Sequence, residues 1–304
     1  MKATTLNLLL LSAAASAAPT IVKRADIDST ILNYALTLEH LEATFYAEAV
    51  KNFTAKHFKE AGFSQPLFYK NLEEIARDEA THVDFLTTAI KAAGYTPVQA
   101  CTYNFGDLTA KTFAQTASII EGVGVSAYLG AAAQITNKTY LTAAGSILTV
   151  ESRHNAFWRN NLVQSPFPQP FDVPLDFDQV YSLAAPFIVA CPSTNPKLPV
   201  KAFPTLTVAT KQSPIPQGAT VQYDVAADTK LPSGPLYVAF PLVTGPVFEP
   251  ATVEGSCIFA KIPTGSNGPA GESYAVLTTS NSSLTDDNTV AGPAVVAVTA
   301  PYLA

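Results

Sequence analysis

Ser118-Ile-Ile-Glu-Gly-Val-Gly-Val-Ser-Ala-Tyr128 is the stretch that decides the fold, because Glu121 is the one charged residue within it. A second isolated acid, Glu151, follows the uncharged run 143–150. Ionised side chains are costly to bury unless they are paired or bound to a metal ion. We therefore interpret both glutamates as inward-facing metal ligands on long helices.

Both glutamates have a partner at helical spacing. Tyr128 lies seven residues after Glu121, which is nearly two turns of helix, and His154 lies three residues after Glu151. Residues three apart lie on one face of a helix, so a Glu–x2–His pair can bind one metal ion. The spacing thus predicts a ligand pair on one helix and an accompanying tyrosine on another.

The same order of motifs occurs earlier in the chain, with Glu39 and Tyr46 followed by Glu79 and His82. Two Glu–x2–His helices plus one glutamate from each of two further helices make the ligand set of di-metal carboxylate bundles. The alternative is a set of exposed acids and hydrogen-bonded histidines, which does not explain the two isolated glutamates. The predicted metal ligands are Glu39, Glu79, His82, Glu121, Glu151 and His154.

Proline and histidine are distributed unevenly around these motifs. Three of the 23 prolines and all four histidines precede residue 165. The first half therefore permits long helices, which we expect at about 28–52, 66–94, 108–136 and 139–162. Rods of this length, about 35–40 Å, pack lengthwise as a four-helix bundle.

The second half is punctuated by proline and has short β-rich runs. Residues 165–199 form a connector rich in proline and aromatic residues, which we expect to wrap against the bundle. Residues 200–304 predict a small β-sandwich for support or adhesion, including contact with a cell wall or surface. The predicted fold class is α+β, with a bundle over 25–164 followed by this β-rich domain. The expected strands are 206–210, 220–225, 236–242, 256–262, 274–279 and 294–299.

The N-terminus has the pattern of a secreted protein. Residues 1–17 read as a signal peptide and 18–24 as a short propeptide ending at Lys23-Arg24. Removing these residues changes the formal net charge from −6 to −9, which argues against nucleic acid as a partner. No other segment reads as a membrane helix. The last 14 residues could be taken for a lipid-anchor signal, but Gly292, Pro293 and Pro301 favour a final β-strand.

Three sequons and three cysteines are consistent with secretion. Glycosylation is expected at Asn52, Asn137 and Asn281, which should then lie on the surface. An oxidising compartment favours one disulfide. Cys101 and Cys191 lie in loops that flank the helical region, so we expect them to pair and Cys257 to remain free.

Residues 28–164 resemble the ferritin-like domain of fungal secreted stress-response and late-sexual-development proteins, and more distantly plant desiccation-related proteins. The resemblance implies a ferritin-like fold that binds two metal ions, with iron as the first expectation and manganese as the alternative. It does not imply a cage. The matching segments are Leu38–Tyr46, Arg77–His82, Glu121–Tyr128 and Thr149–His154, with a looser match in the connector ending at Cys191-Pro192.

Four residues are expected to support the ligands. Glu42, one turn after Glu39, competes with it as a ligand or assists it. Asp78 should hydrogen-bond a ligating histidine, whereas helix 139–162 has Val150 at the corresponding position, so the two metal positions should differ. Tyr46 and Tyr128 either donate hydrogen bonds to ligand carboxylates, act as redox groups or are packed core tyrosines.

Two glycines within helix 108–136, Gly122 and Gly124, predict either close packing or a path for a small molecule to the metal. Three functions are compatible with these features. The first is an oxidase or ferroxidase acting with O₂ or peroxide. The second is a stress protein that sequesters metal without turnover. The third is a structural or surface protein whose β-rich part carries the function.

Overall fold

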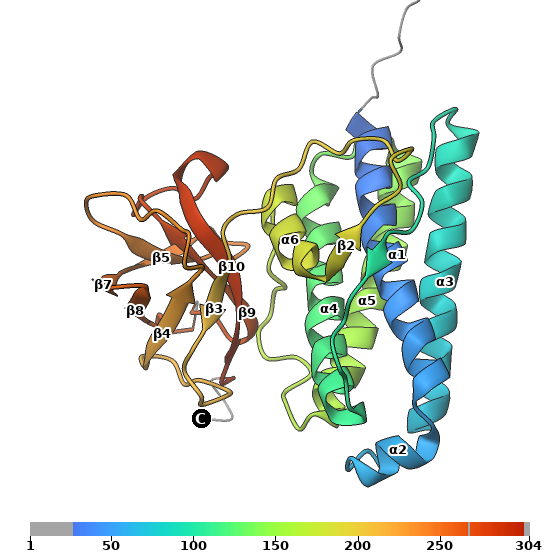
Figure 1. Cartoon of the computed structure of the whole chain (residues 1–304), viewed down its shortest axis with the longest axis horizontal. Helices are drawn as coiled ribbons and strands as arrows, with labels where there is room; N and C mark the ends of the chain where they lie inside the picture. Colours follow the sequence, from blue (N-terminus) through green and yellow to red (C-terminus); the bar gives the residue numbers. More distant parts are fainter. Residues whose placement is uncertain (1–26, 267, 301–304) are drawn as a thin grey trace, which may run out of the picture.

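The computed structural model describes residues 27–266 and 268–300, so the predicted signal peptide and propeptide lie outside the described residues. A helical bundle and a β-rich part lie side by side (Figure 1). This confirms the mixed α+β fold with antiparallel sheets after the helices. No helix in the described ranges is long and apolar enough to cross a membrane.

Four long helices form the bundle, close to the predicted ranges. α1 packs along α3, and α4 packs along α5. Side-chain caps fix two of the helix starts: Oγ1 of Thr109 accepts from N of Thr112, and Oδ1 of Asn137 accepts from N of Thr139. The four helices are α1 (Ile27–Asn52), α3 (Phe68–Ala92), α4 (Ala110–Ala132) and α5 (Lys138–Asn161).

Two short helices lie where none was predicted. α2 (Ala55–Glu60) follows α1 directly and buries Phe58 completely. α6 (Phe177–Ala184) lies within the connector, and its start is capped by Asp176, which accepts from N of Gln179 at 2.8 Å. Helices of this length are too short for apolar periodicity to reveal them.

The connector packs against the bundle. Val173 and Leu175 are buried in the bundle core, and N of Leu175 donates to the carbonyl oxygen of Ser126 on α4 at 3.2 Å. A Cβ atom on Gly130 would lie 1.8 Å from the carbonyl oxygen of Leu175, so this close approach requires glycine. A short 3₁₀ turn, η1 (Ala185–Phe187), follows α6.

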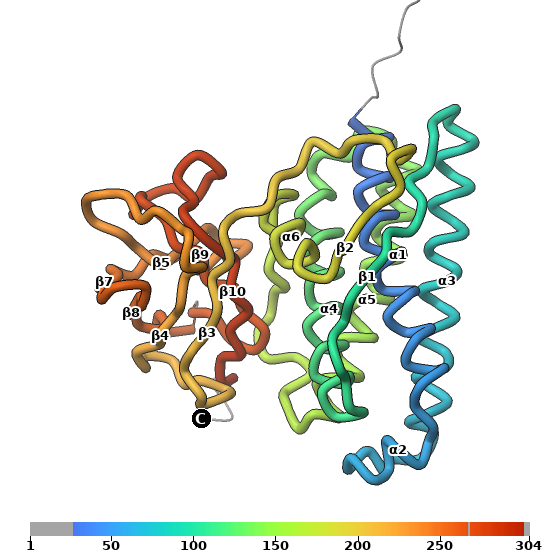
Figure 2. Tube along the Cα trace, in the orientation of Figure 1, coloured from blue at the N-terminus to red at the C-terminus, as the bar shows by residue number. Residues whose placement is uncertain are grey.

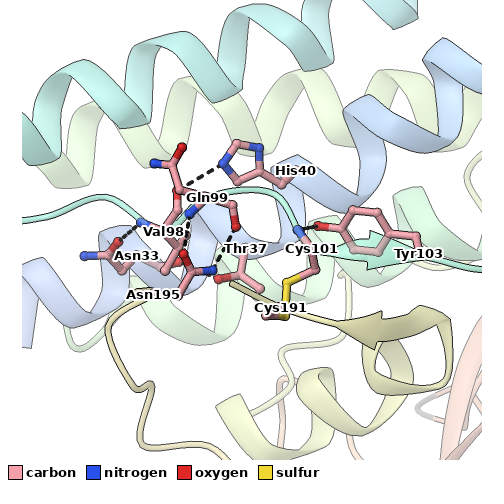
Figure 3. Close-up of a disulfide and its surroundings, with 9 residues drawn as sticks. All are labelled: Asn33, Thr37, His40, Val98, Gln99, Cys101, Tyr103, Cys191 and Asn195. Carbon is pink, nitrogen blue, oxygen red and sulfur yellow. Dashed lines mark hydrogen bonds between the residues drawn. A yellow bond between two sulfur atoms is a disulfide. The ribbon is translucent and has the colours of Figure 1, made fainter. Parts of the chain in front are cut away.

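A disulfide fastens the end of the connector to the loop after α3. Cys101 is bonded to Cys191, next to the antiparallel pair β1 (Thr102–Tyr103) and β2 (Ile188–Ala190) (Figure 3). The side chain of Asn195 accepts from N of Gln99 and donates to its carbonyl oxygen, which holds the same two segments together. Cys257 is free and half-buried.

The β-rich part is a sandwich of two four-stranded antiparallel sheets. One has the order β10-β9-β5-β6 and the other β3-β4-β8-β7, and their inner faces share one apolar core. β6 and β7 were not predicted. The strands are β3 (Leu206–Val208), β4 (Thr220–Val225), β5 (Tyr237–Phe240), β6 (Val247–Pro250), β7 (Thr252–Glu254), β8 (Cys257–Lys261), β9 (Gly271–Thr278) and β10 (Thr289–Val298).

The sandwich contacts the bundle through one sheet. α6 lies between β10 and α4, and it packs against both (Figure 2). Tyr274 of β9 is buried in the bundle core, and its hydroxyl oxygen accepts a hydrogen bond from Oγ of Ser126 at 3.1 Å. The second half of the chain therefore completes the outer surface of α4.

Candidate metal centre

The structure brings the six predicted ligands together in the interior of the bundle. Each of the four long helices contributes, because every motif faces inward. The four glutamates are completely buried, and the two histidines are 8% and 6% exposed. The contributors are Glu39 on α1, Glu79 and His82 on α3, Glu121 on α4, and Glu151 and His154 on α5.

One cluster of metal-ligating atoms surrounds His82. Nδ1 of His82 lies 3.2 Å from Oε2 of Glu39, 3.4 Å from Oε2 of Glu79 and 3.3 Å from Oε1 of Glu151. One ligand atom from each of these four side chains lies within 4.8 Å of every other. The atoms are close enough together to hold a single cation.

A second cluster surrounds His154. Its Nδ1 lies 2.9 Å from Oε1 of Glu79 and 3.4 Å from Oε2 of Glu121. Glu151 completes this group, again within 4.8 Å. Glu79 and Glu151, the glutamates of the two Glu–x2–His pairs, thus belong to both clusters. Glu39 and Glu121 each belong to one cluster.

Buried atoms without partners test whether these residues fit a metal. Six ligand atoms have no hydrogen-bond partner in the described part of the chain. They are both carboxylate oxygens of Glu79 and of Glu151, Oε2 of Glu121 and Nδ1 of His154. Such atoms are costly to bury unless a cation binds them. Carboxylate oxygens and imidazole nitrogens together suit iron and manganese. The residues therefore fit a divalent metal ion.

The electrostatics of the cluster favour positive charge. Burial, together with the charges of Glu151 and Glu79, raises the pKa of Glu39 to about 8. Burial would also raise the pKa of Glu79, but the close approach of the His154 and His82 imidazoles outweighs burial and lowers the pKa to about 2. Burial opposes protonation of His154, yet Glu121 and Glu79 raise its pKa to about 11. Cations that enter the cluster must therefore compete with protons on the histidines.

Two tyrosines hold the terminal glutamates reciprocally. The hydroxyl of Tyr46 on α1 donates to Oε1 of Glu121 on α4, and the hydroxyl of Tyr128 on α4 donates to Oε1 of Glu39 on α1. Nε1 of Trp158 donates to the hydroxyl of Tyr46 at 2.7 Å. Among the predicted roles for the tyrosines, the geometry thus favours donation to ligand carboxylates.

Asp78 contacts the histidine of the other Glu–x2–His helix. Its Oδ2 lies 3.3 Å from Nε2 of His154. Val150 occupies the corresponding position on α5, and its side chain cannot accept a hydrogen bond. Nε2 of His154 therefore has a carboxylate beside it, and position 150 supplies no such group. Of the other histidines, His40 bonds the carbonyl oxygen of Val98 through Nε2, and His57 accepts from N of Thr54 (Figure 3 for His40).

Gly124 makes room for carboxylates. A Cβ atom there would lie 2.9 Å from Oε2 of Glu151 and 3.0 Å from Oε1 of Glu42. Glu42 is 3% exposed, and burial with the charges of Glu151 and Glu79 raises its pKa well above the ordinary value. Close packing against the cluster therefore explains one of the two glycines, and it places Glu42 beside the ligands.

Glu272 approaches the back of the centre from the sandwich and was missed in the sequence. A Cβ atom on Gly122 would lie 2.1 Å from Oε1 of Glu272, so this glycine admits a carboxylate of β9. Tyr274 donates to Oε1 at 3.2 Å and Asn155 to Oε2 at 3.5 Å. Burial raises the pKa of Glu272 to about 7. The helix-interior glycine was the one signal in the sequence, and it did not identify its partner.

A four-helix bundle that gathers four glutamates and two histidines in its core has the features of a ferritin-like protein. Residues 27–164, somewhat less than half of the chain, match the family model described as "Ferritin-like domain", so this region is a ferritin-like domain. The chain is also similar to Protein rds1 of Schizosaccharomyces pombe, with 27% identity over 189 residues, or 62% of this chain. The match spans 46% of the length of that protein.

Proposed function

We propose that the bundle binds two metal ions, iron by preference and manganese as the alternative, and that it oxidises Fe²⁺ with O₂ or peroxide. The observation that carries this proposal is the set of six buried ligand atoms without hydrogen-bond partners in the described part of the chain. Two overlapping clusters, joined by Glu79 and Glu151, support two ions rather than one. A bound iron pair would supply electron transfer to O₂ or peroxide.

The side chains around the clusters fix the ligand positions. Tyr46 and Tyr128 orient the two terminal carboxylates, and Asp78 orients the ring of His154. Complete burial of the four glutamates excludes water from the bridging positions. Since oriented ligands and a dry surrounding tune a metal centre, these contacts favour a reactive site over a simple store of cations.

The test begins with metal analysis of the full chain purified without chelator, followed by loading with Fe²⁺ or Mn²⁺. We expect about two ions per chain, as in related carboxylate bundles. Saturable Fe²⁺ oxidation should be abolished in Glu121→Ala and retained in Glu48→Ala, which removes an exposed glutamate of α1. Tight binding without oxidation would instead support metal sequestration. Substoichiometric metal that cannot be reconstituted would overturn the site.

Secretion is a further part of the proposal. The Cys101–Cys191 disulfide is compatible with an oxidising compartment. Asn52, Asn137 and Asn281 are all exposed, as glycan attachment requires. We expect the mature chain to begin near Ala25, to shift in mass on enzymatic deglycosylation, and to act in stress or development. Contact of the sandwich with a cell wall belongs to the same proposal, and a binding assay with isolated wall material would test it.

A further inference from the structure

An apolar cavity of about 190 Å³ lies against the candidate metal centre. It is open to solvent on one side and is lined by residues of α1, α4, α6 with η1, and β10, so both parts of the chain build it. Ile119, which is 38% exposed, lies on the solvent side. The walls of the cavity include Leu41, Ile120, Val123, Leu183, Phe187 and Val295.

The inner end of this cavity is formed by Glu42 and Gly124. Glu42 is the one side chain with polar atoms among the residues that line the cavity, and it is 3% exposed. Gly124 lies directly over Oε2 of Glu151, one of the two glutamates that belong to both clusters. The cavity therefore extends from the surface to residues that pack directly against the ligands, and its one polar side chain lies at the inner end.

The size and lining of the cavity indicate what it can hold. An engineered apolar cavity of about 150 Å³ stays dry and binds benzene, so about 190 Å³ accommodates one ring with a small substituent. Bound water is disfavoured because it needs two to four polar partners, and this lining offers one carboxyl group. A carboxyl group accepts a hydrogen bond from a hydroxyl in either protonation state.

We propose that this cavity binds a small single-ring phenol, with the ring among the apolar walls and the hydroxyl on Glu42. The proposal goes beyond the proposed function, because it assigns a ligand to the cavity and no reaction. Val295 of β10 and Leu183 of α6 close the outer wall. The sandwich thereby has a role in the site, since without β10 the cavity would lose one side.

Two other cavities fit this ligand class less well. The apolar cavity beside Tyr128, between α1, α4 and α5, has a volume of about 30 Å³ and cannot admit a ring. The cavity of about 240 Å³ between bundle and sandwich is lined by Arg159, Asp172 and Glu272, which favour a charged or strongly polar molecule. Of these three cavities in the described part of the chain, only the one at Glu42 combines apolar walls with a single hydrogen-bonding group.

The experiment measures binding of 4-fluorophenol and fluorobenzene to the full chain by ¹⁹F NMR, with metal loaded and after treatment with chelator. We expect saturable binding of both probes, with 4-fluorophenol bound about tenfold more tightly because of one hydrogen bond. Glu42→Leu should abolish that preference while fluorobenzene still binds. An unchanged preference would overturn the role of Glu42.

Two cavity variants separate this site from unspecific binding. Ala184→Leu fills part of the cavity with a larger side chain. It should weaken the binding of both probes at least tenfold, because the added atoms occupy the space of the ring. Ala144→Leu, which lines the smaller apolar cavity, is the matched control and should leave binding unchanged. Equal effects of the two variants would overturn the site. If Ala184→Leu does not fold, Val123→Ala, which enlarges the cavity, should shift the preference toward larger rings.

The two proposals can fail separately. Phenol binding by a protein that holds no metal would keep the cavity assignment and overturn the proposed function. Stoichiometric metal without saturable binding of either probe would overturn the cavity assignment alone.

Discussion

The two halves of the bundle, α1 with α3 and α4 with α5, carry the same motifs and differ in what surrounds them. Each half supplies one terminal glutamate, one tyrosine and one Glu–x2–His pair. The tyrosine of each half holds the glutamate of the other. Asp78 of α3 contacts His154, whereas Val150 of α5 offers His82 no such bond. The comparison teaches that the two halves repeat the ligand residues, whereas the residues that contact those ligands differ from one half to the other.

The largest effect should come from removing a bridging glutamate. Glu79 belongs to both clusters and Glu39 to one. We expect Glu79→Ala to lose nearly all bound metal, whereas Glu39→Ala keeps about one ion, since one cluster stays complete. Metal analysis after reconstitution distinguishes them. The pair Glu151→Ala and Glu121→Ala should behave in the same way if the halves are equivalent, and equal losses in all four variants would contradict bridging.

The difference at Asp78 and Val150 predicts a smaller effect. Removing a hydrogen-bonding partner of a ligating histidine costs about 10–100-fold in metal affinity. Asp78→Val should therefore lower the binding affinity for one of the two ions by about this factor, and it should make the surroundings of the two histidines alike. Competition with a calibrated chelator measures each step. Asp84→Val, an exposed acid on the same helix, is the control. An unchanged affinity in Asp78→Val would show that His154 is oriented by other contacts.

Sequence pattern predicted the four long helices and the inward side of each motif because both follow from spacing on one chain segment. Each of the two glutamates, Glu39 and Glu121, lies seven residues before a tyrosine, so the spacing placed each pair on one face of its helix. It did not show that each tyrosine bonds the glutamate of the other helix. Glu272 is 117 residues from Asn155 and farther still from Gly122, and no local pattern encodes such a distance. Short elements such as α2, β6 and β7 were missed for want of periodicity.

The hydrogen bonds of the two tyrosines predict that replacing Tyr46 and replacing Tyr128 will destabilise the chain to different degrees. Tyr46→Phe would remove the hydrogen-bond partner of both Oε1 of Glu121 and Nε1 of Trp158, whereas Tyr128→Phe would remove only that of Oε1 of Glu39. Each buried group that loses its partner costs about 1–3 kcal/mol, so Tyr46→Phe should be the more destabilising. Urea unfolding of metal-free protein measures this.

A tyrosine of the sandwich provides the control for these variants. The buried hydroxyl of Tyr223 has no hydrogen-bond partner among the described residues. Tyr223→Phe should therefore be neutral or stabilising, because it removes a buried polar group without breaking a bond. A loss of stability in Tyr223→Phe as large as in Tyr46→Phe would mean that the removed hydrogen bonds do not explain the difference.

The smallest effect concerns pH and the half that contacts the sandwich. Burial raises the pKa of Glu272 from an ordinary value of 4.5 to about 7. The folded chain therefore binds a proton more tightly than the unfolded chain, and this contribution to stability is complete below pH 4.5 and is lost as pH rises through 7. Glu272→Gln keeps an uncharged polar group and should remove this dependence.

We expect Glu272→Gln to be close to wild type at pH 4 and more stable than wild type at pH 8. The carboxyl is half-buried, so partial exposure to solvent limits the gain to about 1–2 kcal/mol. Thermal unfolding across this pH range measures the difference in stability from wild type. For the control Glu254→Gln, at an exposed position in the same sandwich, this difference should not change with pH. A gain that did not depend on pH would mean that packing against Gly122, and not ionisation, sets the cost of this contact. The contact with the sandwich would then distinguish the α4–α5 half by its shape and not by its charge.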